Sequence, residues 1–94
     1  MHANPRLADL IPAFLENRRH DVTAILAALD RLDFATVESL GHGMKGAGGS
    51  WGFQPITDIG AALELAAERA DGDASRRCAS ELASYLERVE VTSA

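Results

Sequence analysis

The segment from Gly41 to Gly52 contains the residues whose types and spacing are best suited to chemistry. It reads G-H-G-M-K-G-A-G-G-S-W-G and holds six of the eight glycines, the only lysine and the only tryptophan of the 94-residue chain. A histidine with the ordinary pKa of about 6.5 is largely neutral at pH 7, so His42 has a nitrogen lone pair for nucleophilic attack. Lys45 follows three residues later and places a positive charge beside it on a helix.

The glycine spacing predicts a helix with two faces free of side chains. A glycine inside a helix costs about 1 kcal/mol relative to alanine, so several of these glycines should have a use. Gly41 and Gly48 fall on the apolar stripe, here called the inward face, where a neighbouring helix could approach closely. Gly46 and Gly49 share a side of the helix with His42, here called the open face. We expect His42 to be exposed.

An exposed histidine beside an ammonium group suits a phosphoryl carrier. Phosphoryl transfer needs mainly positioning and charge neutralisation, so a small face can suffice if a partner supplies the metal and the acceptor. The phosphorylated imidazole gains negative charge, which Lys45 can stabilise. The open face would let a partner's active site come down over His42.

Amphipathic helices are expected to position this segment. Apolar residues recur at three- and four-residue steps along most of the chain, and no strand pattern competes. Pro12 lacks a backbone donor, so a short lead-in helix or turn is expected before a long helix that ends near Leu29. The later helices are expected over Phe34 to Ser50 or Trp51, Pro55 to about Ala70, and about Ala74 to Val89 or Val91. The prediction is an all-α, antiparallel four-helix bundle, a single domain over 1–94 with a frayed N-terminus over about 1–6.

Capping residues predict both ends of the helix that carries His42. Asp33 is a suitable N-cap, and Gly52 should end the helix before Pro55 opens the next one. Trp51 and Phe53 are interpreted as core residues at this turn, with a docking role for Trp51 left open.

Composition narrows the class of protein. A net charge of −5 and a pI near 5.0 argue against binding to nucleic acid or to an anionic membrane. The apolar runs are far shorter than the roughly 20 residues of a membrane span, and the N-terminus lacks signal-peptide features. Cys78 is the single cysteine, so an internal disulfide is excluded. We expect it to be a small buried residue. A cytoplasmic monomer is expected.

The residues around His42 resemble the histidine phosphotransfer (HPt) domain family. The family motif has a histidine, a large aliphatic residue two positions later, Lys-Gly directly after it, and a glycine that closes the helix. Here these are His42, Met44, Lys45, Gly46 and Gly52. The likeness covers nearly the whole chain, although methionine replaces the commoner leucine and a glycine follows the histidine where a small hydroxylated residue is usual.

The resemblance implies a role for each matching residue. His42 would be the phosphoacceptor, Lys45 the cation that stabilises the phosphate, and Gly52 the helix-ending glycine. The positions expected to receive the partner are Gly46, Gly49 and Glu38. The partners would be a response-regulator receiver domain, a hybrid histidine kinase, or both. The protein would be a phosphocarrier without an ATP site or cofactor of its own, with Mg²⁺ expected only in the receiver domain.

No metal site is expected in this chain. His2 and His20 stand alone, at the frayed end and on a solvated face. The acidic residues Glu64, Glu68 and Asp71 are interpreted as a solvated helix face.

Two other classes of function compete with a phosphoryl carrier. The glycines Gly41, Gly43 and Gly46 form a G-x-G-x-x-G pattern, but a dinucleotide site requires a preceding strand, and a Walker A loop requires the lysine after the last glycine. The main alternative is a non-catalytic helical bundle that docks a receiver or kinase partner without phosphotransfer.

Overall fold

The apolar periodicity forms four helices in the computed structural model, which describes residues 7–93. Their bounds are Leu7–Asp30 for α1, Phe34–Trp51 for α2, Gln54–Glu68 for α3 and Gly72–Ser93 for α4. The predicted all-α fold is therefore confirmed. The predicted fraying at residues 1–6 lies outside the described residues.

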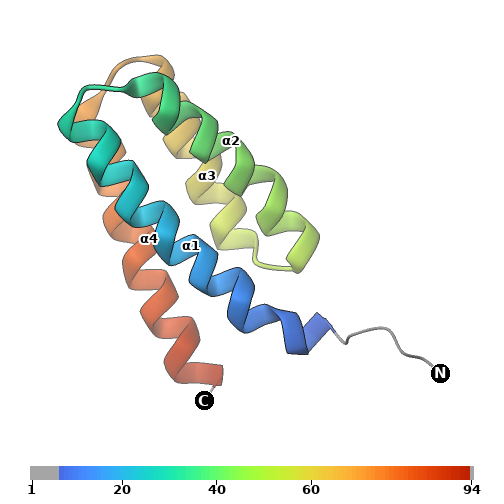
Figure 1. The fold of residues 1–94 in the computed structure, drawn as a ribbon. Helices are drawn as coiled ribbons and strands as arrows, with labels where there is room; N and C mark the ends of the chain where they lie inside the picture. The colour runs from blue at the N-terminus through green and yellow to red at the C-terminus, as the bar shows by residue number, and fades with distance from the viewer. Residues whose placement is uncertain (1–6, 94) are drawn as a thin grey trace.

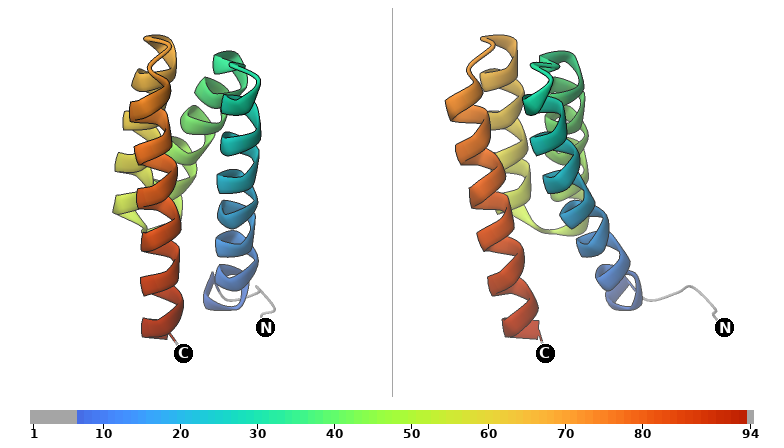
Figure 2. Two further views of the ribbon diagram at one scale, coloured as in Figure 1. Left: turned by 90° about the vertical axis from the view of Figure 1, so that its left-hand side faces the viewer. Right: turned by 60° about the vertical axis from the view of Figure 1, so that its left-hand side comes forward.

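The helices form an antiparallel bundle in which each packs against two neighbours (Figure 1). Helix α2 packs on α3, α3 on α4, α4 on α1, and α1 on α2, and the contact between α2 and α3 is the most extensive of the four. The bundle measures 48 × 24 × 19 Å. Because α1 and α4 have 24 and 22 residues and α2 and α3 only 18 and 15, the ends of the longer pair extend beyond the α2–α3 turn (Figure 2).

The core contains apolar side chains from all four helices. Its largest fully buried members are Ile25, Val37, Met44, Ile56, Leu63, Leu82 and Leu86. Cys78 is buried as predicted, and burial raises the pKa of its thiol. Trp51 and Phe53 are half-buried and stack on Phe14, with ring centroids 4.8 and 5.6 Å away. The prediction that both are core residues at the α2–α3 turn is confirmed.

Both predicted ends of α2 are confirmed by their capping geometry. Asp33 accepts hydrogen bonds from the backbone N–H and the hydroxyl of Thr36, at 3.1 and 2.6 Å, and these bonds lower the pKa of its carboxyl group. At the other end Gly52 adopts a left-handed conformation with φ of 83°, and the N–H of Phe53 donates to the Gly48 carbonyl at 2.8 Å.

The predicted lead-in before Pro12 is wrong, because α1 runs without interruption from Leu7 to Asp30. Proline's fixed φ fits a helix, and this proline lies in the second turn of α1, where it removes one backbone hydrogen bond and crowds the carbonyl four residues earlier without ending the helix. Beyond it, Phe14 and Leu15 are buried in the core and hold the helix in place.

The third helix also ends earlier than predicted. Helix α3 stops at Glu68, and Ala70 is an exposed residue with φ of 53°, not a buried helical one. The N–H of Asp71 donates to the Ala66 carbonyl at 2.9 Å, which closes the helix end. Helix α4 then begins at Gly72, two residues before the predicted start.

Candidate functional site

Three glycines let α2 and α3 pack backbone against backbone. A Cβ atom added at Gly41 would lie 2.7 Å from the Glu64 nitrogen, and one at Gly48 would lie 2.5 Å from the Thr57 nitrogen. On α3, a Cβ at Gly60 would lie 2.7 Å from the Gly41 oxygen. The predicted close approach at the inward face is confirmed. Gly60 was missed, since its spacing on α3 does not reveal which helix it faces.

A hydrogen bond between the two helices reinforces this close contact. The Thr57 hydroxyl donates to the backbone carbonyl of Lys45 at 3.0 Å. That carbonyl belongs to the turn of α2 that follows His42. The backbone that carries both proposed site residues is therefore held directly against α3.

The open face of α2 has the geometry that the spacing predicted. The His42 side chain is 71 % exposed. A Cβ added at Gly43 or Gly46 would have no heavy atom within 4 Å among the described residues, and one at Gly49 would meet only the Thr57 hydroxyl at 3.6 Å. The imidazole therefore stands on a surface that lacks neighbouring side chains along one side.

Glu64 of α3 contacts both His42 and Lys45. Its Oε2 atom lies 3.0 Å from His42 Nδ1, and its Oε1 atom lies 2.7 Å from Lys45 Nζ. The hydrogen bond from Lys45 holds the pKa of the Glu64 carboxyl below its ordinary value, and the contact with His42 acts in the same direction against the opposing effect of burial. Glu64 is therefore a carboxylate at neutral pH.

The interpretation of Glu64 as part of a solvated face is wrong. Its side chain is only 17 % exposed, because the close contact of Gly41 with Gly60 brings this part of α3 against α2. Glu68 and Asp71 are exposed, as expected. The sequence contained no signal for the difference, since it does not specify which turn of α3 faces His42.

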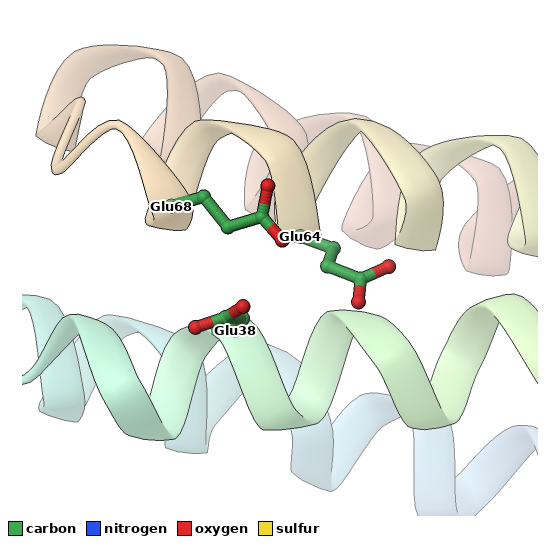
Figure 3. Close-up of side chains that lie close together, drawn as sticks. All are labelled: Glu38, Glu64 and Glu68. Atoms are coloured by element: carbon green, nitrogen blue, oxygen red, sulfur yellow. The ribbon is translucent and has the colours of Figure 1, made fainter.

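Glu38, Glu64 and Glu68 form a carboxylate cluster between α2 and α3 (Figure 3). One oxygen from each lies within 4.8 Å of the others. A hydrogen bond with Glu68 raises the pKa of Glu38, and burial and the charge of Glu68 raise it further. Glu38, a predicted docking position, thus lies half-buried beside His42, in a shallow hollow of about 270 Å³ that also includes Ala35, Ser39 and Glu64.

Oxygen ligands of this kind are those that hard divalent cations prefer. In the carboxylate cluster, however, Glu64 already binds Lys45 and His42, and Glu38 bonds to Glu68. The absence of a metal site stays a prediction. His20 is exposed, with Nε2 3.4 Å from Glu16, and His2 lies outside the described residues.

No helix within residues 7–93 is both long enough and apolar enough to cross a bilayer.

The bundle and the surface histidine on α2 together define a small helical domain with an exposed imidazole beside an ammonium group. The family model described as Hpt domain matches residues 9–92, so the chain belongs to the Hpt domain family. The resemblance drawn from the histidine motif is confirmed. Domains of this family are phosphocarriers in phosphorelays, where they interact with receiver domains and histidine kinases. No curated protein and no solved structure matches the chain.

Proposed function

We propose that this protein accepts a phosphoryl group on His42 from a receiver-domain aspartate and passes it to another receiver. The supporting observation is the 71 % exposed imidazole on the open face of α2, with the Lys45 ammonium one turn away, in a chain of the Hpt domain family. The protein itself is a carrier that needs no nucleotide or cofactor, and Mg²⁺ is supplied by the receiver domain.

The transfer requires one nucleophile and one nearby positive charge. A ring nitrogen of His42 attacks the phosphorus of the aspartyl phosphate, a P–N bond forms, and the P–O bond to the aspartate breaks. The aspartate leaves as a carboxylate, and attack by a second aspartate reverses the step. Lys45 is 43 % exposed and has a flexible stem, so its ammonium can turn from Glu64 to a phosphoryl oxygen.

The receiver would dock over the open face. Gly46 and Gly49 present no side chain there, so a partner's backbone can come close to the imidazole. Glu38 lies in the hollow beside His42 and would meet the rim of the partner's active site. We expect the protein to act as a monomer in the cytoplasm.

A phosphotransfer assay tests this proposal. A receiver domain charged with labelled phosphate should transfer it to the protein as an acid-labile, base-stable adduct. His42→Gln should abolish labelling. His20→Gln is the matched control, since it removes an exposed histidine on α1, and it should be labelled like the wild type. Lys45→Ala should slow transfer and leave the helix content unchanged.

The same assay distinguishes phosphotransfer from the alternative function, docking of a partner without transfer. Labelling that persists in His42→Gln contradicts the proposed acceptor. A receiver that binds the wild type and His42→Gln equally, with no transfer to either, would support a non-catalytic docking module instead.

A further inference from the structure

Leu32, in the turn between α1 and α2, combines an unfavourable backbone conformation with an exposed side chain. Its φ is 56°, in the left-handed region, which strains a residue that has a Cβ atom. Its side chain is 74 % exposed, the largest fraction for any large apolar side chain within residues 10–89. The core of the bundle therefore does not account for a leucine at this position.

The backbone of the turn does not account for it either. Leu32 occupies the left-handed position of a helix-ending motif in which the N–H of Asp33 donates to the Ala28 carbonyl at 2.8 Å. Gly52 and Ala70 occupy the corresponding positions at the ends of α2 and α3. The motif favours glycine because glycine adopts the left-handed conformation without strain. The end of α1 would thus form more easily without the leucine side chain.

Ion pairs hold the turn and surround Leu32 with paired charges. A guanidinium nitrogen of Arg76, on α4, lies 3.1 Å from the Asp30 carboxylate. Arg31 and Asp33, on either side of Leu32, lie 3.5 Å apart, and Asp33 also caps α2. The turn is therefore tied to three helices, and little further ordering is needed when a partner binds it. Leu32 is a fixed apolar projection between two charges that neutralise each other.

The surface on which the receiver is proposed to dock extends to this turn. The shallow hollow beside His42 follows the exposed side of α2 as far as Ala35, three residues after Leu32. From Phe34, the first residue of α2, the helix rises by about 12 Å to His42. A protein interface of standard size covers about 800 Å² on each partner, which is a patch of roughly 16 Å radius. A receiver centred on His42 would therefore reach the α1–α2 turn, at the end of the bundle shown at the top of Figure 1.

We propose that Leu32 is a specificity-determining residue that inserts into an apolar depression at the edge of the receiver's docking face. This inference rests on the proposed function of His42. Leu32 contributes to binding and takes no part in the transfer itself. A receiver with a charged group at this place would have to desolvate that group against leucine, so it would bind less tightly. A leucine that the turn merely tolerates would have a different consequence, because its removal would leave transfer unchanged.

The test measures transfer from the receiver domain that labels the wild type, over a range of receiver concentrations. Leu32→Gly and Leu32→Asn remove the apolar side chain and suit the left-handed conformation. Both should raise KM about tenfold with kcat unchanged, as for one leucine lost from a buried interface. Leu32→Met keeps an apolar side chain of similar size and should have nearly the wild-type KM. The urea midpoint of Leu32→Gly should not fall, since the strain at the turn is relieved.

Two controls separate docking from changes in the fold. Ala70→Gly makes the matching backbone change at the end of α3 and removes only a methyl group, so its KM should equal that of the wild type. Leu10→Ala removes an exposed leucine near the opposite end of α1 and should also leave KM unchanged.

A small phosphoryl donor shows whether the site itself is intact. The His42 imidazole forms a P–N bond to the phosphorus of phosphoramidate as the donor's own P–N bond breaks and ammonia leaves. This reaction needs no docking, so the wild type and all Leu32 variants should be phosphorylated at the same rate.

The outcomes separate the two proposals. A wild-type KM in Leu32→Gly and Leu32→Asn overturns the role of Leu32 and leaves His42 as the acceptor. Lower kcat at unchanged KM, or slower labelling by phosphoramidate, also overturns it, because the effect would then lie at the phosphoryl site. A lower urea midpoint in Leu32→Gly would show that the side chain serves the fold instead. A wild type that takes up no phosphoryl group on His42 overturns the proposed function, and this inference with it.

Discussion

Glycines lie on both the inward and the open face of α2, but they have opposite surroundings on the two faces. A Cβ atom at Gly41 or Gly48 of the inward face would come within 3 Å of the α3 backbone. On the open face, one at Gly46 would meet nothing within 4 Å among the described residues, and one at Gly49 would meet only the Thr57 hydroxyl at 3.6 Å. Each of these glycines costs a helix about 1 kcal/mol relative to alanine. For the inward pair the close packing of α2 on α3 offsets this cost. The glycines of the open face have no such packing contact, and we interpret them as giving a partner access to His42.

The comparison also shows that packing and chemistry are linked. The inward contact of Gly41 with Gly60 brings Glu64 to 3.0 Å from His42 Nδ1 and to 2.7 Å from Lys45 Nζ. The inward face therefore sets the electrostatic surroundings of the imidazole, and the open face sets its accessibility. Substitutions on the two faces should separate these effects.

The largest expected effect is on the inward contact. Gly60→Ala would place a Cβ 2.5 Å from the Lys45 nitrogen and 2.7 Å from the Gly41 oxygen, and neither backbone atom can move without shifting a helix. We expect the free energy of unfolding to fall by about 3 kcal/mol, as for an overpacked core. Urea unfolding measures it. Ala61→Gly, at the exposed neighbouring position on α3, should lower stability by only about 1 kcal/mol. Equal stability of Gly60→Ala and the wild type would show that the helices can separate at little cost.

An intermediate effect is expected on transfer rather than on stability. Gly46→Leu adds a side chain to the open face and should slow transfer from a receiver by about tenfold or more, because the partner would have to pack around it. Its unfolding free energy should not fall, since the added side chain enters open space. Ser80→Leu on the exposed face of α4 serves as the control and should transfer at the wild-type rate. Unchanged transfer in Gly46→Leu would remove this position from the docking surface.

The smallest expected effect is on the stability of two glycine variants, which differ in backbone conformation but not in the space around the added side chain. An added Cβ at Gly43 or Gly52 would have no neighbour within 4 Å among residues 7–93, but of these two glycines only Gly52 has a positive φ, of 83°. Gly43→Ala should therefore stabilise the protein by about 1 kcal/mol. Gly52→Ala should destabilise it by about 1 kcal/mol, because a left-handed conformation strains an L-residue. Thermal unfolding of both variants tests the pair, and the same sign of change in each would contradict it.

Local signals in the sequence predicted the ends of α2 correctly. Asp33 caps its N-terminus through Thr36, and Gly52 ends it in the left-handed conformation. Helix boundaries that depend on packing as well as on neighbouring residues were predicted less well. Pro12 was expected to separate two elements, but core packing just beyond it keeps α1 continuous. Ala70 was expected inside a helix and instead forms its left-handed end.

The sequence alone determined the helical class, the position of His42 and Lys45 on one side of α2, and the two faces of that helix. These follow from the 3.6-residue period and from capping residues, which act within a few positions along the chain. Only the tertiary structure decided that Glu64 lies against His42 and Lys45. That contact depends on which turn of α3 meets α2, a register set by the backbone approach at Gly41 and Gly60, two glycines far apart in the sequence.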